Sequence, residues 1–184
     1  MERRALQWWR RRLWSQVQTG RILEVGAGTG KNIPYYPPGA EVVAIDLSPR
    51  MIEEARKVAA EHGSDVDLQV MDAQRLDFPD AYFDAVVTSC VFCTVPNPAL
   101  GLSEVYRVLK PGHRAYFLEH VLSDKRGVRR AMKGLSRVTV RMMGDHLTRR
   151  TCAELSAAGF ELETEEDLWL DVIKLCVARK PVAG

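Results

Sequence analysis

The sequence predicts an α/β fold in which helices cover both faces of a mostly parallel sheet. Short apolar runs alternate with segments of helical periodicity, and glycine or polar residues follow where several of the runs end. The chain has 184 residues, 46% hydrophobic and 27% charged, which suits one domain with an ordinary core. We find neither an apolar span of about 20 residues nor a signal segment, and expect a cytoplasmic protein.

Each element of this fold follows from a local pattern. Strands are predicted from apolar or alternating runs at 21–25, 41–45 and 66–70, from Phe83, from Arg114, and near 160–167 and 172–179. Helices are predicted from apolar residues at helical spacing, one after Ser48, one after Asn97, one at 128–142 and one from Thr148 or Thr151 to Gly159. Ser48 and Asn97 each precede a proline, a pattern typical of an N-cap followed by a first-turn proline.

Three glycines, Gly26, Gly28 and Gly30, follow the first strand at alternate positions. Glycine lets a ligand approach the backbone closely, so the loop predicts a phosphate, a dinucleotide or another adenosine cofactor. A phosphate-binding loop needs Ser or Thr after its lysine, whereas Asn32 follows Lys31. A dinucleotide loop has its third glycine one residue later and continues into a helix, which the three prolines of NIPYYPPG disfavour.

Asp46 lies twenty residues after Gly26, at the end of the second predicted strand. This spacing suits a carboxylate that accepts hydrogen bonds from two ribose hydroxyls. It does not separate NAD from other adenosine cofactors, so both stay open on this feature alone.

Five short motifs occur in order across residues 21–121: EVGAGTG from Glu24, DLS from Asp46, MDA from Met71, FDAV from Phe83 and EVYRVLKPG from Glu104. Together they resemble the class I S-adenosylmethionine-dependent methyltransferases. The resemblance implies a Rossmann-like sheet of seven strands with the last strand antiparallel. It also implies S-adenosylmethionine as the cofactor.

The resemblance assigns roles to individual residues. The glycine loop would contact the methionine part of the cofactor, Asp46 the ribose, and Leu47 and Asp72 the adenine. The implied cofactor-binding residues are Glu24, Gly26, Ala27, Gly28, Gly30, Asp46, Leu47, Met51, Asp72, Ala73, Ser89 and Cys90. Many small relatives also carry a Tyr-Asp segment that closes over the cofactor. Residues 1–20 do not contain it, so the resemblance does not indicate what closes this site.

Three further segments bear on the acceptor: CVFCTVPNP from Cys90, FLEHV from Phe117 and GDHLTRRT from Gly144. They are similar to a small branch containing ubiquinone-biosynthesis methyltransferases, phospholipid N-methyltransferases and membrane-associated alkyl thiol methyltransferases. We therefore expect methyl transfer to a small apolar acceptor, a thiol or a lipid-like molecule. The alternatives are a phenol or quinone precursor as acceptor, and a non-catalytic S-adenosylmethionine-binding module.

The candidate catalytic residues are His120, at the end of the fifth strand, and Asp145 with His146 before a later helix. A histidine there would take a proton from an amine or phenol acceptor. A thiol, with a pKa of about 8.5, hardly needs such a base. Cys90 and Cys93 lack the context of a redox pair or of a second zinc-ligand pair, so we interpret them as wall residues and expect no metal.

Charge is distributed unevenly along the chain. Residues 1–21 carry a net charge of +5 and residues 110–150 of +8, whereas 22–109 and 151–184 are acidic. We predict a basic amphipathic helix within 1–20, a methyltransferase domain over 21–184, and a second basic helix at 128–142. Packing on the domain is favoured over peripheral contact with an anionic membrane. Nucleic-acid binding has no supporting motif, and the oligomeric state is not predicted.

Overall fold

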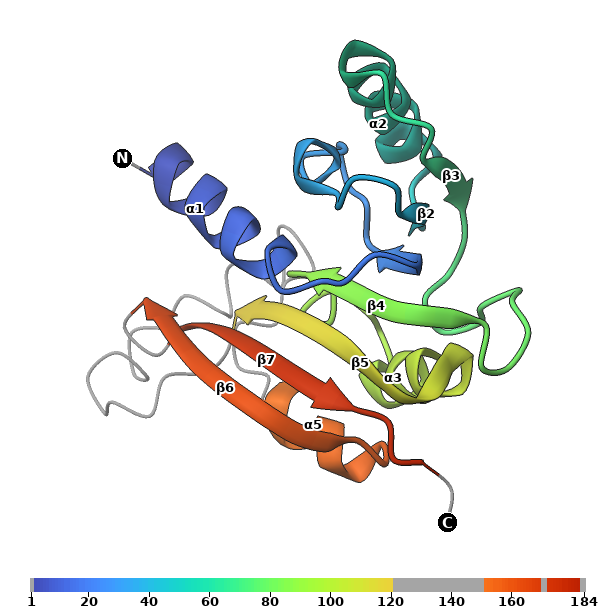
Figure 1. Cartoon of the computed structure of the whole chain (residues 1–184), viewed down its shortest axis with the longest axis vertical. Helices are drawn as coiled ribbons and strands as arrows, with labels where there is room; N and C mark the ends of the chain where they lie inside the picture. Colours follow the sequence, from blue (N-terminus) through green and yellow to red (C-terminus); the bar gives the residue numbers. More distant parts are fainter. Residues whose placement is uncertain (1, 121–150, 170–171, 183–184) are drawn as a thin grey trace.

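The computed structural model describes residues 2–120, 151–169 and 172–182, which contain a seven-stranded sheet of order β3-β2-β1-β4-β5-β7-β6 (Figure 1). The strands are β1 (Arg21–Val25), β2 (Glu41–Asp46), β3 (Asp67–Val70), β4 (Phe83–Ser89), β5 (Leu109–His120), β6 (Glu161–Trp169) and β7 (Ile173–Arg179). The pairs among β1–β5 are parallel, and β7 runs antiparallel to both β5 and β6, which makes it the strand that is reversed relative to the other six. The predicted fold class is confirmed.

The described helices are α1 (Glu2–Trp14), η1 (Ile33–Tyr35), α2 (Pro49–His62), α3 (Pro98–Val108) and α5 (Thr151–Ala157). Both predicted caps form: the Ser48 hydroxyl accepts from the Met51 amide at 3.4 Å, and the Asn97 side chain accepts from the Leu100 amide at 3.3 Å. The proline-rich segment makes only the short helix η1. The helix expected at 128–142 lies outside the described residues.

The fifth strand differs from its prediction in one respect. It begins at Leu109 rather than at Arg114, because Leu109 pairs with Phe83 across an irregularity in the ladder before regular pairing resumes at Ala85 and Arg114. The Lys-Pro-Gly segment after α3 is thus part of the strand.

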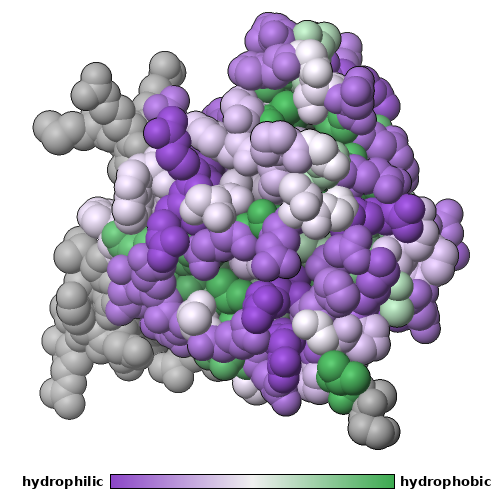
Figure 2. All heavy atoms as spheres, viewed as in Figure 1, coloured by the Kyte–Doolittle hydropathy of each residue, from purple (hydrophilic) through white to green (hydrophobic). Residues whose placement is uncertain are grey.

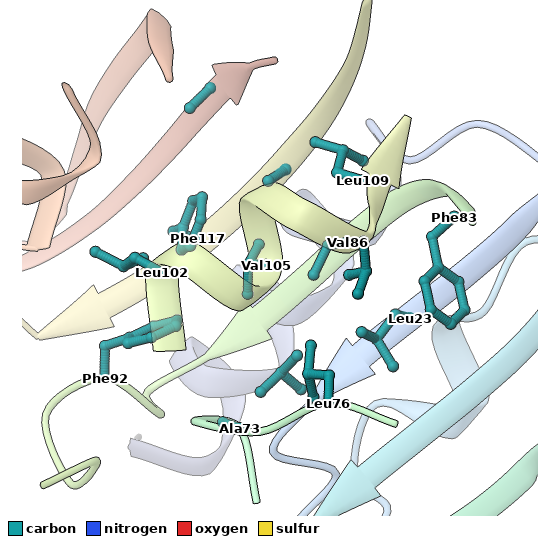
Figure 3. Close-up of a cluster of buried hydrophobic side chains, with 14 of the residues drawn as sticks. Leu23, Ala73, Leu76, Phe83, Val86, Phe92, Leu102, Val105, Leu109 and Phe117 are labelled. Carbon is teal, nitrogen blue, oxygen red and sulfur yellow. The ribbon is translucent and has the colours of Figure 1, made fainter. Parts of the chain in front are cut away.

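Side chains alternate across the sheet, so each face has its own core. On one face, Leu102 and Val105 of α3 pack against Val86 and Phe117 of the sheet (Figure 3). On the other face, α1 packs against Ile22 and Leu175. The helix α2 covers the same face as α1, with its buried residues around Ala44 of β2. Helices therefore cover both faces, as predicted.

The N-terminal helix α1 is held by its last turn and the segment after it. Leu13, Trp14 and Val17 are buried against the sheet, and Arg12 pairs with Glu166 of β6 at 3.1 Å. Trp8, on the outer side, is 53% exposed. Across the part of the chain that is described, no helix combines the length and the apolar character that a bilayer span requires. The face drawn in Figure 2 is mostly hydrophilic, with hydrophobic atoms in small separate areas.

Candidate active site

One cavity, of about 240 Å³, lies at the carboxyl ends of the parallel strands; we call it the main cavity because most of the predicted cofactor residues line it. The ends of β1, β2 and β4 and the segments that follow β3 and β4 form its walls. This is the edge at which parallel sheets bind ligands, because the loops diverge there. Eight of the predicted cofactor residues line it: Gly26, Gly28, Asp46, Leu47, Asp72, Ala73, Ser89 and Cys90.

The three glycines of the loop have three different environments, all at positive φ. A Cβ on Gly26 would lie 2.2 Å from Val91, and one on Gly30 would lie 3.0 Å from the Cα of Ala55 in α2. These two glycines therefore let the loop pack closely on its neighbours. At Gly28 a Cβ would meet nothing within 4 Å, so the backbone there faces open space in the cavity.

Asp46 is oriented by two backbone amides. Its Oδ2 accepts from Gly28 N at 2.9 Å, and its Oδ1 accepts from Ser48 N at 2.9 Å. An ionised carboxylate has about four lone-pair positions, so two acceptor positions stay available to a ligand. The hydrogen bond to Gly28 also fixes the glycine loop relative to the end of β2.

Asp72 is held by its neighbour Gln74. The Gln74 amide donates to Oδ1 at 2.9 Å, and the Gln74 side-chain nitrogen lies 3.1 Å from both carboxylate oxygens. Gln74 in turn accepts from the backbone of Asn97, the N-cap of α3, at 3.0 Å. The cavity wall also includes Leu47, which is 63% exposed and offers the cavity an apolar surface.

A second cavity of about 300 Å³ adjoins the first and shares Gly26, Gly28 and Ser89 with it. Its other lining residues are Arg10, Ala27, Thr29, Lys31, Asn32 and Met51. Arg10 comes from α1, so the N-terminal helix supplies a wall of the site. The positively charged residues Arg10 and Lys31 thus both line the second cavity, which shares the glycine loop with the main cavity.

Glu24 lies behind the glycine loop and is fully buried. Its Oε1 accepts from Asn32 Nδ2 at 2.5 Å, and its Oε2 accepts from the Tyr36 hydroxyl. Burial raises the pKa of Glu24 to about 7, although the hydrogen bonds from Tyr36 and Asn32 and the charge of Arg10 oppose the rise. Burial and the nearby Glu24 also raise the pKa of the Tyr36 hydroxyl.

Asn32 connects this buried network to the cavity. Its nitrogen also donates to the Ser89 hydroxyl at 3.1 Å. Its Oδ1 is buried and accepts no hydrogen bond from the described part of the chain. A buried amide oxygen without a donor is costly, so this atom is suited to accept from a bound ligand.

The turn after β4 separates the main cavity from α1. Cys90 has φ = 55°, a region that residues other than glycine rarely adopt, and its amide donates to the Leu118 carbonyl at 2.7 Å. The buried Glu119 supports the turn, because its Oε1 accepts from Thr88 Oγ1 at 3.1 Å and from Val91 N at 3.2 Å. Cys93, which the sequence suggests as a wall residue, is buried beneath the turn.

The remaining predicted site residues divide into three groups. Ala27 and Met51 line the second cavity. Glu24 and Gly30 line neither cavity and act on them through Asn32 and through the packing of the loop. His120 ends β5 opposite Ile173. Asp145 and His146 lie outside the described residues, and the catalytic roles of all three stay predictions.

Arg10 and Asn32 are among the residues of the cavity walls that the sequence did not predict. Arg10 is one of six arginines in residues 1–21, and nothing local distinguishes it from the others. Asn32 carries a weak signal, because it takes the place that Ser or Thr would occupy in a phosphate-binding loop.

Residues 23–117, which include every motif around the two cavities, match the protein family described as "Methyltransferase domain". The chain belongs to the S-adenosylmethionine-dependent methyltransferases. The cofactor of the family is S-adenosylmethionine, so this methyltransferase has the cofactor that its glycine loop and Asp46 suggest.

The names of curated relatives of this methyltransferase indicate different methyl acceptors. A phosphatidylethanolamine N-methyltransferase from Cereibacter sphaeroides is 39% identical over 70% of this chain and 65% of its own length. Thiol S-methyltransferase TMT1B from Homo sapiens is 33% identical over 89% of this chain and 74% of its own length. A demethylmenaquinone methyltransferase from Thermus thermophilus is 40% identical over 60% of this chain and 53% of its own length. The chain thus spans between about half and three quarters of these relatives.

Solved structures agree on the fold. A methyltransferase from Methanosarcina mazei has a TM-score of 0.74 and 23% identity, with 91% of this chain and 95% of the other covered. The [4+2]-cyclase SpnF has a TM-score of 0.77 and 22% identity, with 97% and 80% covered. Because a protein named as a cyclase shares the architecture, these similarities show the fold, and the reaction must be argued from the site.

Proposed function

We propose that this protein transfers the methyl group of S-adenosylmethionine to a small apolar acceptor. The observation that carries the proposal is the pairing of Asp46 with the backbone of Gly28 at the point where the two cavities meet. It presents a carboxylate and an open stretch of backbone to the same ligand. A cofactor with a ribose in its middle fits that arrangement.

The lining residues match the parts of the cofactor in order. Asp72 accepts from the adenine amino group, Leu47 lies against the adenine ring, and Asp46 accepts from the ribose hydroxyls. The methionine part extends along Gly28 into the second cavity. This fit is supported by the open space at Gly28 and by the free acceptor positions of Asp46.

We assign the amino-acid end of the cofactor to the second cavity. Arg10 and Lys31 provide positive charge for its carboxylate, and the buried Asn32 Oδ1 provides an acceptor for its ammonium group. Glu24 holds the Asn32 amide in place, since it accepts from the nitrogen and leaves the oxygen available. The N-terminal helix, through Arg10, then takes part in closing the site.

When bound, the cofactor supplies a methyl group already activated by a sulfonium. The protein's task is therefore to hold the acceptor in line with that methyl group and to exclude water. Ser89 and Cys90 line the cavity where the acceptor side begins. A thiol acceptor needs little help to lose its proton, whereas an amine or phenol would benefit from His120 or His146 as a base.

Two acceptor classes have support from relatives. The phosphatidylethanolamine N-methyltransferase favours a lipid amine, and the thiol S-methyltransferase, which matches a larger share of this chain, favours a thiol. The quinone-pathway relative makes a phenolic ring the next candidate. Peripheral contact with a membrane belongs with the lipid alternative.

Release of S-adenosylhomocysteine from labelled S-adenosylmethionine tests the proposal. One reaction contains a short alkyl thiol, a second contains phosphatidylethanolamine liposomes, and a third contains a phenolic quinone precursor. Product above the acceptor-free control in any of the three supports methyl transfer and selects the acceptor class. Cofactor binding without product in all three would contradict the proposal and favour a non-catalytic module.

A further inference from the structure

A small third cavity lies between α1 and the ends of three strands. Its volume is about 50 Å³, and it is lined by Leu6, Trp9, Arg10, Ser89, Cys90, Leu118 and Ile173. Leu118 and Ile173 are buried residues of β5 and β7, and Leu6 and Trp9 are half-buried residues of α1. Apart from Arg10, Ser89 and Cys90, the walls are large apolar and aromatic side chains. We call this cavity the α1 chamber.

The α1 chamber adjoins both other cavities. It shares Ser89 and Cys90 with the main cavity, and Ser89 and Arg10 with the second cavity. The adenosine part and the amino-acid part of the cofactor are joined at its sulfonium. A cofactor that occupies both cavities therefore has its sulfonium near Ser89, where the two cavities meet. The α1 chamber opens at the same residue.

We propose that the α1 chamber binds the apolar body of the acceptor, and that Leu6 and Trp9 determine which acceptors fit. This inference rests on the proposed methyl transfer and adds the selecting residues to it. One water molecule needs about 10–15 Å³ of such cavity space, so a chamber of about 50 Å³ has room for a short alkyl group. A fatty acyl chain would require the helix to move away from the sheet.

The position of Trp9 makes it the residue to test. It lies beside Trp8, which is 53% exposed and does not line the chamber. The two tryptophans are adjacent in the same helix, so Trp8→Ala is a matched control for Trp9→Ala. The helix keeps its attachment in both variants, because Leu13, Trp14 and Val17 are unchanged. Leu6→Phe provides the opposite change, since it fills the chamber instead of enlarging it.

The experiment measures binding rather than turnover. The protein is saturated with S-adenosylhomocysteine, and the dissociation constants of methyl alkyl sulfides of increasing chain length are measured by calorimetry. We expect Trp9→Ala to tighten binding of the longer sulfides by about fourfold for each methylene that gains an apolar contact. Leu6→Phe should weaken all but the shortest sulfides, and Trp8→Ala should match the wild type.

The possible failures are distinguishable. If the wild type does not bind S-adenosylhomocysteine, the proposed function itself is overturned. If it binds S-adenosylhomocysteine but Trp9→Ala and Leu6→Phe keep the wild-type chain-length profile, or if no sulfide binds at all, the α1 chamber is not the acceptor site. Should Trp9→Ala fail to fold, the profile of Leu6→Phe decides the question alone.

Discussion

The Gly28 amide donates a hydrogen bond of 2.9 Å to the Asp46 carboxylate, across 18 residues of sequence. Gly28 belongs to the loop after β1 and Asp46 ends β2, so the bond joins two neighbouring strand ends at the cavity mouth. It presents the carboxylate and the backbone as one surface. Disturbing either residue should affect the same ligand in different ways.

Asp46→Ala should weaken binding of S-adenosylmethionine by roughly 1–3 kcal/mol, because the ribose hydroxyls lose their acceptor and the glycine loop loses its anchor. Calorimetric titration of the purified variant measures this directly. Asp65→Ala, at an exposed position that lines neither cavity, is the control and should bind as the wild type does. Unchanged affinity in Asp46→Ala would remove this residue from the ribose site.

Gly28→Ala tests whether the open backbone serves a ligand. Gly28 and Gly39 both have positive φ, 53° and 76°, and a Cβ on either would meet nothing within 4 Å. Each alanine variant should lose a similar stability, roughly 1 kcal/mol, through backbone strain alone. Only Gly28→Ala should also lose cofactor affinity, because only Gly28 lines the cavities. Equal affinities in the two variants would mean that no ligand approaches Gly28.

Arg10→Ala should weaken binding of S-adenosylhomocysteine by about 10- to 150-fold, which corresponds to losing a hydrogen bond to a charged group of roughly 1.5–3 kcal/mol. Binding of 5′-methylthioadenosine, which lacks the amino-acid end, should not change. Arg11→Ala is the matched control, because Arg11 is the exposed neighbour of Arg10 in α1. If Arg10→Ala weakened the binding of both ligands equally, Arg10 would not be the partner of the cofactor's carboxylate.

The buried Glu24 predicts a pH dependence of stability. Its pKa is raised from 4.5 to about 7, so the folded state holds the proton more tightly than the unfolded state. The resulting stabilisation is complete below pH 4.5 and is lost as the pH rises through 7. A shift of this size corresponds to roughly 3 kcal/mol between those limits.

Chemical unfolding of the wild type and of Glu24→Gln between pH 4.5 and 8 isolates this contribution. Glutamine does not titrate, so the free energy of unfolding of the wild type minus that of the variant should fall by roughly 3 kcal/mol over the interval. Glu61→Gln, on the exposed side of α2, is the control for replacing a carboxylate on the surface. A difference that stays constant with pH would show that the Glu24 carboxyl titrates alike in the folded and unfolded chain.

Much of the adenosine side of the site could be predicted from the sequence, because its parts sit at the ends of consecutive parallel strands. Gly28 lies in the loop after β1, Asp46 is the last residue of β2 and Asp72 follows β3, and the topology brings these strand ends to one edge of the sheet. The strands and helix caps that set these positions could be recognised from the sequence, because each depends on residues that are close together in the chain.

The amino-acid side could not be predicted in the same way. Arg10 reaches the second cavity because Leu13, Trp14 and Val17 bury the end of α1 on the sheet, and that packing involves residues of the last strand. No local pattern marks one arginine among six for such a position. Asn32 likewise depends on Glu24, eight residues away, and on Ser89, 57 residues away.

The packing of α1 also bears on the order in which the protein matures on the ribosome. Arg12 and its partner Glu166 are 154 residues apart, and the strand that helps to bury α1, β7, is translated later still. At a translation rate of about 5–20 residues per second, roughly 10–30 s pass between the synthesis of α1 and the synthesis of that strand. A nascent chain that already carries its glycine loop and both aspartates therefore has no closed α1 chamber. Cofactor capture and acceptor selection should be acquired together, when translation has passed Ile173.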